Sequence, residues 1–238
     1  MSTPPRQSRR AFLRISGLAA LGATLSACAA PLGRLNMPAE LAVTGPDDAL
    51  QRLVAGNQRY ASNQSTDLNE SIARRAAVAG GQSPFATVFS CVDSRVPPEL
   101  VFDRGIGDLF VIRTAGHVLD HAVLGSLEFG VAELKIPLLL VMGHQKCGAV
   151  KATIEAVEQH ASAPADIQTL VEAITPAVEQ SHGQAGDALD NAVHANVALT
   201  VAKLRGLPSF AEAIGQGRLK IAGACYDLDS GLVELMQV

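Results

Sequence analysis

The sequence has no tryptophan, only two tyrosines and only four cysteines in 238 residues. Four cysteines are too few for a scaffold that depends on many disulfides. A hydrophobic share of 48% excludes an intrinsically disordered chain. The chain also lacks a phosphate-binding loop of the Gly-Lys-Ser/Thr type. Its length suits one α/β domain or two small ones, either of which can bury a sizeable core.

Acidic residues are missing from residues 1–27, which contain four arginines. Removing this segment changes the formal net charge from -4 to -8, because four positive charges leave and no negative ones. A body this acidic argues against nucleic acid as a partner, since binding to a phosphate backbone needs a basic face.

Residues 1–29 have the pattern of an export signal. Arg9 and Arg10 resemble the twin-arginine signal, and they precede an apolar run over residues 15–27. That run is shorter than the roughly 20 residues of a transmembrane helix. It ends in a sequence that resembles a bacterial lipobox with Cys28 as the lipidated residue, and which also fits an A-x-A cleavage site. We expect export to the periplasm or cell envelope, as a free or lipid-anchored form; an amphipathic helix with chance arginines is the alternative.

Apolar runs alternate with helical patterns after a Pro- and Gly-rich linker at residues 30–46. The runs predict strands at 86–90, 109–113, 137–143 and 219–224, with an edge strand at 231–236. The helical patterns lie at 47–61, 71–79, 122–134, 149–160 and 187–204, with Asp47 as a possible N-cap of the first. This alternation predicts an α/β fold with a mainly parallel central sheet flanked by helices, in one domain over residues 47–238. The role of a polar, alanine-rich helical insertion at 159–187 is open.

Polar side chains cluster directly after two of the expected strands, at residues 90–95 and 143–148. Ligands of open α/β sheets bind at the carboxyl ends of the strands, where both clusters fall. Cys91, His144 and Cys147 supply two thiolates and one imidazole, which is a tetrahedral zinc set with one position left open. Asp93 is either the fourth ligand or a hydrogen-bond acceptor that stands back from the metal.

Spacing alone leaves other interpretations of these residues open. A buried cysteine is often only a small apolar residue, and a lone histidine in a loop is usually structural or solvated. Cys91 and Cys147 could also form a disulfide in an oxidising compartment. A cysteine nucleophile is a further option, although residues 91–95 are not the longer anion-binding loop expected of a phosphatase.

The clusters at 91–95 (CVDSR) and 144–148 (HQKCG) resemble the paired zinc motifs of the β-class carbonic anhydrases. The similarity continues through residues 107–113, 126–129 and 226–227, and so covers roughly residues 47–238. It implies the β-class fold as a homodimer or dimer-based oligomer, with a small-molecule substrate. It also implies one zinc ion per chain, held by the two cysteines and the histidine, and reversible hydration of carbon dioxide to bicarbonate and a proton.

The same resemblance implies a dyad of Asp93 and Arg95. Zinc lowers the pKa of bound water towards about 7, so that hydroxide is available at neutral pH. Asp93 can accept a hydrogen bond from that hydroxide, while Arg95 holds Asp93 ionised and turned away from the metal. If the pair breaks, Asp93 could bind zinc and close the site.

Four further residues are implied by the resemblance to border the substrate: Gln82, Phe110, Phe129 and Gly148. Gln82 matches a glutamine that hydrogen-bonds the zinc-bound oxygen species in plant-like members. Phe110 matches an aromatic wall of an apolar pocket, and Phe129 stands where those members have a tyrosine.

The family members with an allosteric bicarbonate switch carry a tryptophan where this chain has Val88, and this difference argues against such a switch here. Arg113 and Tyr226 nevertheless match other parts of that switch. We therefore expect an open, plant-like site.

Several remaining polar residues have ordinary interpretations. His117 and His121 are expected to be solvated surface histidines, with proton transfer to solvent as the alternative role. Lys146 is expected to be exposed. Cys225 has no ligand spacing to the other cysteines and is expected to be a buried apolar residue.

Three other functions use the same cysteines and histidine. The first is hydrolysis of carbonyl sulfide or carbon disulfide on the same fold, which only pocket shape and access distinguish. The second is zinc binding without catalysis by an exported lipoprotein. Gln82, Asp93 and Arg95 argue against it, since zinc storage needs neither a dyad nor a substrate donor. The third is a redox protein with a Cys91–Cys147 disulfide.

Overall fold

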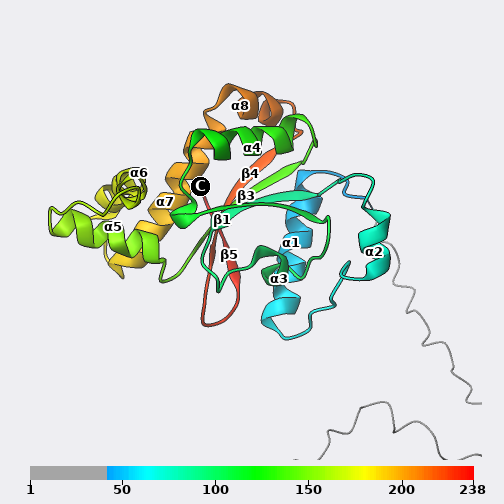
Figure 1. The fold of residues 1–238 in the computed structure, drawn as a ribbon, viewed down its shortest axis with the longest axis horizontal. Helices are drawn as coiled ribbons and strands as arrows, with labels where there is room; N and C mark the ends of the chain where they lie inside the picture. Colours follow the sequence, from blue (N-terminus) through cyan, green and yellow to red (C-terminus); the bar gives the residue numbers. More distant parts are fainter. Residues whose placement is uncertain (1–41) are drawn as a thin grey trace, which may run out of the picture. The chain divides into compact units, whose positions relative to one another are not determined.

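A five-stranded sheet in the order β2-β1-β3-β4-β5 forms the centre of the fold (Figure 1). Its strands are β1 (Ala86–Cys91), β2 (Leu109–Thr114), β3 (Leu138–His144), β4 (Lys220–Tyr226) and β5 (Val233–Met236). β1, β2, β3 and β4 run parallel, and β5 pairs antiparallel with β4. The predicted fold class is confirmed, and the expected edge strand is present as β5, which the structure shows to be antiparallel.

The computed structural model describes residues 42–238. The predicted export signal, Cys28 and the first part of the predicted linker lie outside the described residues. Within residues 42–238, no helix is long and apolar enough to cross a membrane.

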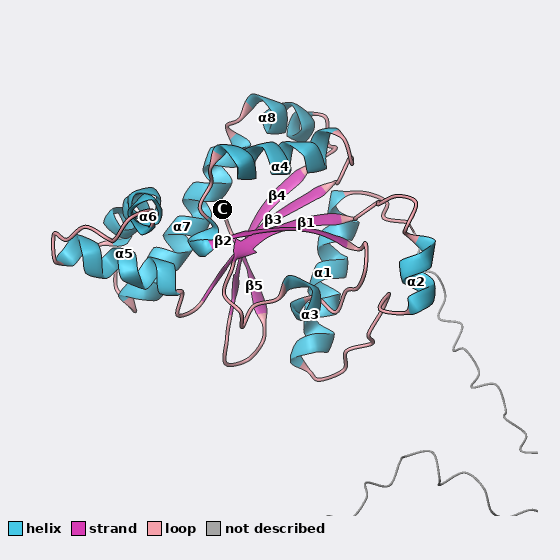
Figure 2. Ribbon diagram, viewed as in Figure 1, coloured by secondary structure: helices cyan, strands magenta, loops and turns pink. Residues whose placement is uncertain are grey.

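Helices cover both faces of the sheet (Figure 2). α1 (Pro46–Ala61) and α3 (Pro98–Val101) pack on one face, and α4 (His121–Ala132), α7 (Ala188–Arg205) and α8 (Pro208–Gly215) pack on the other. Every residue of β1 and β3 is buried, because these central strands are covered on both faces. That double burial explains why their sequences are continuous apolar runs rather than alternating ones.

The first two helices have different kinds of N-cap. α2 (Ile72–Ala77) lies within the helix expected at 71–79 and begins after Ser71, whose side chain accepts a hydrogen bond from the backbone N–H of Arg74. The expectation that Asp47 caps α1 is wrong, because Gly45 holds that position and Pro46 starts the helix. Asp47 lies in the first turn, where a carboxylate interacts favourably with the helix dipole.

The segment at 159–187 contains α6 (Ile167–Ser181), which packs against α7 and α5 (Gly148–Glu158). Its apolar side turns inward: Ile174 and Val178 are buried in the same cluster as Cys91 and Cys147. The insertion therefore forms part of the wall behind the predicted metal site, a role that its polar composition did not reveal.

Asn57 links α1 to two distant parts of the chain. Its side chain is 2% exposed, donates to the carbonyls of Val101 and Gly231, and accepts from the backbone N–H of Val233. Asn57→Leu would leave these three backbone groups without that partner, at about 1–3 kcal/mol for each that stays buried. We expect the free energy of unfolding, measured by urea denaturation, to fall by about 3 kcal/mol. A loss below about 0.5 kcal/mol, typical of an unimportant surface change, would contradict this.

Candidate metal centre

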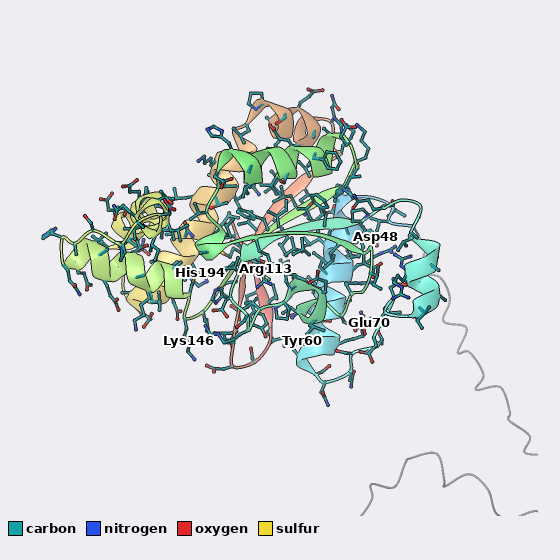
Figure 3. The ribbon with its side chains drawn as sticks, in the orientation of Figure 1. Asp48, Tyr60, Glu70, Arg113, Lys146 and His194 are labelled. Carbon is teal, nitrogen blue, oxygen red and sulfur yellow. The ribbon has the colours of Figure 1, made fainter. Side chains whose placement is uncertain are left out.

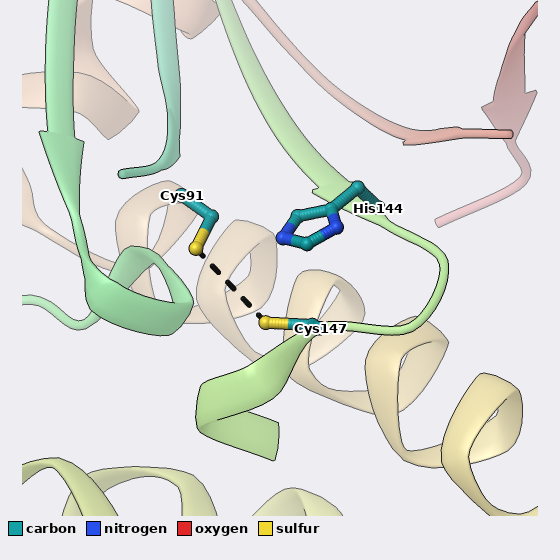
Figure 4. Close-up of side chains that lie close together, drawn as sticks. All are labelled: Cys91, His144 and Cys147. Carbon is teal, nitrogen blue, oxygen red and sulfur yellow. Dashed lines mark hydrogen bonds between the residues drawn. The ribbon is translucent and has the colours of Figure 1, made fainter. Parts of the chain in front are cut away.

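Three ligand residues meet where the order of the strands reverses. Cys91 ends β1 and His144 ends β3; these strands are neighbours, while β2 lies on the other side of β1. Such a switch point is the usual binding crevice of an open α/β sheet. Cys147 is the N-cap of α5. The ligand atoms of the three buried residues lie within 4.8 Å of one another (Figure 4), as the sequence predicted.

The donor atoms fit zinc. His144 Nδ1 lies 2.8 Å from the carbonyl oxygen of Gln145, so Nδ1 carries the proton and Nε2 carries the free lone pair. Nε2 is buried and has no hydrogen-bond partner among the described residues. The two Sγ atoms are 4.0 Å apart, close to the about 3.8 Å expected for two thiolates on one tetrahedral zinc with Zn–S bonds of about 2.3 Å. A disulfide needs about 2.05 Å, and the cysteines among residues 42–238 are free.

The two thiols are electrostatically coupled. Cys147 donates to the sulfur of Cys91 (dashed line in Figure 4), which lowers the pKa of Cys91 and raises that of Cys147. The backbone N–H of Gly116 also donates to Cys91 Sγ, at 3.3 Å. The hydrogen bond between the sulfurs requires a proton on Cys147, and a cation bound by both thiolates would displace that proton.

Asp93 and Arg95 form the predicted dyad. Arg95 Nε lies 2.9 Å from Asp93 Oδ1 and Arg95 Nη2 lies 2.7 Å from Oδ2, a bidentate pair. The hydrogen bond from Arg95 lowers the pKa of Asp93 to about 2. Asp93 Oδ2 is 3.8 Å from His144 Nε2, so the carboxylate faces the ligand atoms while Arg95 holds it.

Arg113 holds the loop that joins the metal ligand to the dyad. From the edge strand β2 (Figure 3), its Nε donates to the carbonyl of Cys91 at 2.8 Å and its Nη2 to the carbonyl of Asp93 at 2.7 Å. The sequence linked Arg113 only to an allosteric switch. The sequence feature that could have indicated this role is an arginine near the end of an apolar strand that neighbours the strand ending in Cys91.

Arg113→Lys should weaken catalysis without removing the metal, because an ammonium group does not reproduce the planar fork that reaches both carbonyls. We expect kcat to fall by about tenfold, the lower range for residues that orient metal ligands, with zinc content unchanged. Stopped-flow hydration and metal analysis measure the two quantities. Arg75→Lys, on the exposed side of α2, is the control; equal rates in both variants would contradict the assignment.

The predicted substrate residues separate into two groups. Gly148 begins α5 directly after Cys147. Phe110 pairs with Thr87, at the opposite end of β1 from Cys91, and its ring lies 6.5 Å from that of Phe129.

Phe129 is 47% exposed on α4, and exposed Gln82 lies in the segment that leads into β1. Within one chain, the structure therefore brings Gly148 to the ligand atoms and leaves Gln82, Phe110 and Phe129 at the other end of the strands.

The expectation of a solvated His117 is wrong. This residue is 2% exposed, and burial lowers its pKa to about 4, so that the ring is neutral and remote from solvent. His121 begins α4 and is exposed, as expected. Lys146 is 59% exposed and pairs with Asp229, which confirms its surface position.

Cys225 is buried, as the sequence indicated, and burial raises its pKa to about 12. Val88 is fully buried in β1. The hydroxyl of Tyr226 lies 3.3 Å from that of Tyr60.

Comparison with known proteins agrees with this site. The carbonic anhydrase family matches residues 86–233, which contain all three ligands and the dyad. The chain is 40% identical to a carbonic anhydrase of Mycolicibacterium smegmatis, over 81% of this chain and 94% of that protein. It is 37% identical to a carbonic anhydrase of Pseudomonas aeruginosa, over 75% of this chain and 82% of that protein.

Among solved structures, a Coccomyxa β-carbonic anhydrase in complex with acetazolamide matches with a TM-score of 0.60 and 28% identity. The match covers 79% of this chain and 86% of that one. With the same fold, a zinc-type ligand group and relatives at 40% identity over most of its length, the chain belongs to the β-carbonic anhydrase family.

Proposed function

We propose that Cys91, His144 and Cys147 bind one zinc ion and that the chain reversibly hydrates carbon dioxide to bicarbonate and a proton at that site. The observation that carries this proposal is the unpartnered Nε2 of His144, which lies with two sulfurs beside a carboxylate held by an arginine. When bound, zinc supplies a Lewis acid that lowers the pKa of water towards about 7.

Asp93 orients the attacking oxygen in this proposal. Because its pKa is about 2, the side chain is ionised at neutral pH and can accept hydrogen bonds but not donate them. It accepts one from the nucleophilic water. Arg95 keeps both carboxylate oxygens engaged and so keeps them from coordinating the metal. This arrangement supports the open, plant-like type of site, and the buried Val88 in place of a tryptophan supports it further.

Stopped-flow hydration of carbon dioxide by the zinc-loaded protein tests the function, with metal analysis on the same sample. We expect one zinc per chain and a rate far above the buffer background. Hydrolysis of carbonyl sulfide, measured in parallel, identifies the alternative substrate. Zinc binding without either activity would indicate a metal-binding protein and overturn the proposal.

We propose also that the chain forms a homodimer or a dimer-based oligomer through the β2 edge of the sheet. β2 is half-buried along its whole length and is an edge strand of the sheet. Exposed apolar side chains surround it: Val92 is 50% exposed, Ile106 40% and Phe129 47%. An exposed strand edge with apolar neighbours is a natural pairing surface.

An antiparallel, two-fold pairing of β2 strands would explain why Phe110 and Phe129 lie far from the ligand atoms of their own chain. It would place the start of one β2 beside the end of the other, and so bring Phe110 of the partner subunit toward this chain's ligands. Co-purified mixed dimers of Cys147→Ser and Phe110→Ala chains test this. Pairing in trans leaves one intact site per mixed dimer, so activity should exceed that of either homodimer. Activity at the average of the two homodimers, or a monomer in sedimentation, would contradict it.

Export is proposed on the sequence alone, from Arg9, Arg10 and the apolar run that follows them. Expressed as the full chain in a bacterium with twin-arginine transport, the protein should reach the cell envelope. Arg9→Lys with Arg10→Lys should retain it in the cytoplasm, and Cys28→Ala should release a membrane-bound fraction. Unchanged fractionation in all variants would overturn this.

A further inference from the structure

The turn at residues 115–117 supports the metal centre from behind. Gly116 and His117 both have positive φ, at 60° and 44°. A side chain at Gly116 would not fit, because a Cβ there would lie 2.6 Å from Cδ1 of Ile174 in α6. This backbone geometry directs the N–H of Gly116 at Cys91 Sγ.

Asn196, in the middle of α7, holds this turn. Its side chain is 6% exposed, and Nδ2 lies 2.9 Å from the carbonyl oxygen of Gly116 and 3.1 Å from His117 Nε2. A carbonyl only accepts hydrogen bonds, so the amide nitrogen must face it. Both protons of one NH₂ group are thus used on two successive residues of the turn.

The histidine completes the arrangement. Because Nε2 of His117 accepts from Asn196, its ring proton is on Nδ1. The ring packs edge-on against Phe89 of β1, with 6.0 Å between ring centroids and 89° between the planes. Phe89 lies two residues before Cys91, so the turn, the strand and α7 form one buried unit around the ligand.

We propose that Asn196 is a positioning residue for the metal centre: it fixes the 115–117 turn so that Gly116 N–H bonds to the thiolate of Cys91. A hydrogen bond to a thiolate draws electron density from the sulfur. It therefore limits the charge that Cys91 gives to zinc and leaves the metal a stronger Lewis acid. The inference rests on the proposed zinc site, which is tested separately by the zinc content of the wild type.

Asn196→Leu, which keeps the number and branching of the side-chain heavy atoms but has no N–H group, tests this assignment in two ways. In cobalt-substituted protein, the sulfur-to-cobalt charge-transfer band should move to longer wavelength, because a thiolate without its hydrogen bond is easier to oxidise. Zinc affinity, measured by competition with a chelator, should fall about tenfold, the lower range for loss of an outer-shell partner, because the turn that Asn196 fixes no longer holds Cys91 in place; this loss outweighs the stronger electron donation of the freed sulfur.

Asn57→Leu is the matched control, since Asn57 is also a buried asparagine whose amide group has two acceptors, here two backbone carbonyls, but on the opposite face of the sheet. It should leave the band and the zinc affinity at the wild-type values. Wild-type values for Asn196→Leu, or equal changes in both variants, would overturn the proposal. If the wild type binds no zinc, the proposed function fails instead.

Two further measurements apply if Asn196→Leu does not fold. Asn196→Ala removes the same donors and should shift the same band. In wild-type protein loaded with ¹¹³Cd, the amide proton of Gly116 should show scalar coupling to the metal through the sulfur. Absence of that coupling would contradict the hydrogen bond on which the inference depends.

Discussion

Replacing Cys147 with serine should leave the protein without stoichiometric zinc and reduce carbon dioxide hydration to the uncatalysed background. A serine hydroxyl stays protonated at neutral pH, so the site would lose one of its two anionic ligands. Metal analysis after gel filtration and stopped-flow kinetics on the same sample measure both effects.

Cys225→Ser is the matched control for this loss. Cys225 is a free, buried cysteine in the same apolar cluster, but its sulfur is not among the ligand atoms. This control should keep one zinc and wild-type activity, so that a general effect of a buried hydroxyl is excluded. Normal activity with serine at position 147 would overturn the ligand assignment.

Asp93→Asn should keep the zinc and lose most of the rate, by about a hundredfold, the lower end for loss of a positioned proton-handling group. An amide has the shape of the carboxylate, but its NH₂ group would face either the side chain of Arg95, which now donates to both oxygens, or the proposed nucleophilic water. Either Arg95 or the nucleophilic water then loses its acceptor. The measurement is the stopped-flow rate at saturating zinc. A rate within threefold of wild type would contradict the role of Asp93.

The pH dependence of that rate gives an independent check. Arg95 holds the folded-state pKa of Asp93 at about 2, below the usual value of about 3.9. The carboxylate therefore stays charged above the unfolded value, and its contribution is lost only as the pH falls towards 2. Activity lost between pH 6 and 8 must therefore come from the titration of a group other than Asp93.

Sequence patterns predicted the parts of this molecule that local chemistry determines. β1 and β3 are buried on both faces and so have continuous apolar sequences, and two of the ligands, Cys91 and His144, end those same strands. Cys91, His144 and the Asp93–Arg95 pair could therefore be placed correctly from their positions relative to the strands. The start of α2 was predictable for the same reason, since Ser71 caps it within four residues.

The burial of His117 could not be predicted, because it depends on Asn196, which is 79 positions away in the sequence. The burial of one side of α6 could not be predicted for a similar reason, because its apolar residues face α5 and α7 rather than the sheet. The distance of Phe110 from the ligands follows from the register of β2 against β1, which no motif encodes.

The three ligands come from separate segments, and Cys91 and Cys147 are 56 positions apart in the sequence. A bound ion would therefore act as a reversible cross-link that closes a long loop and ties two strands to a helix. Stripping the metal would remove that link at the carboxyl end of the sheet, so thermal stability would rise and fall with free zinc concentration as with any ligand of the native state. The same three side chains would then both hold the catalytic metal and stabilise the fold.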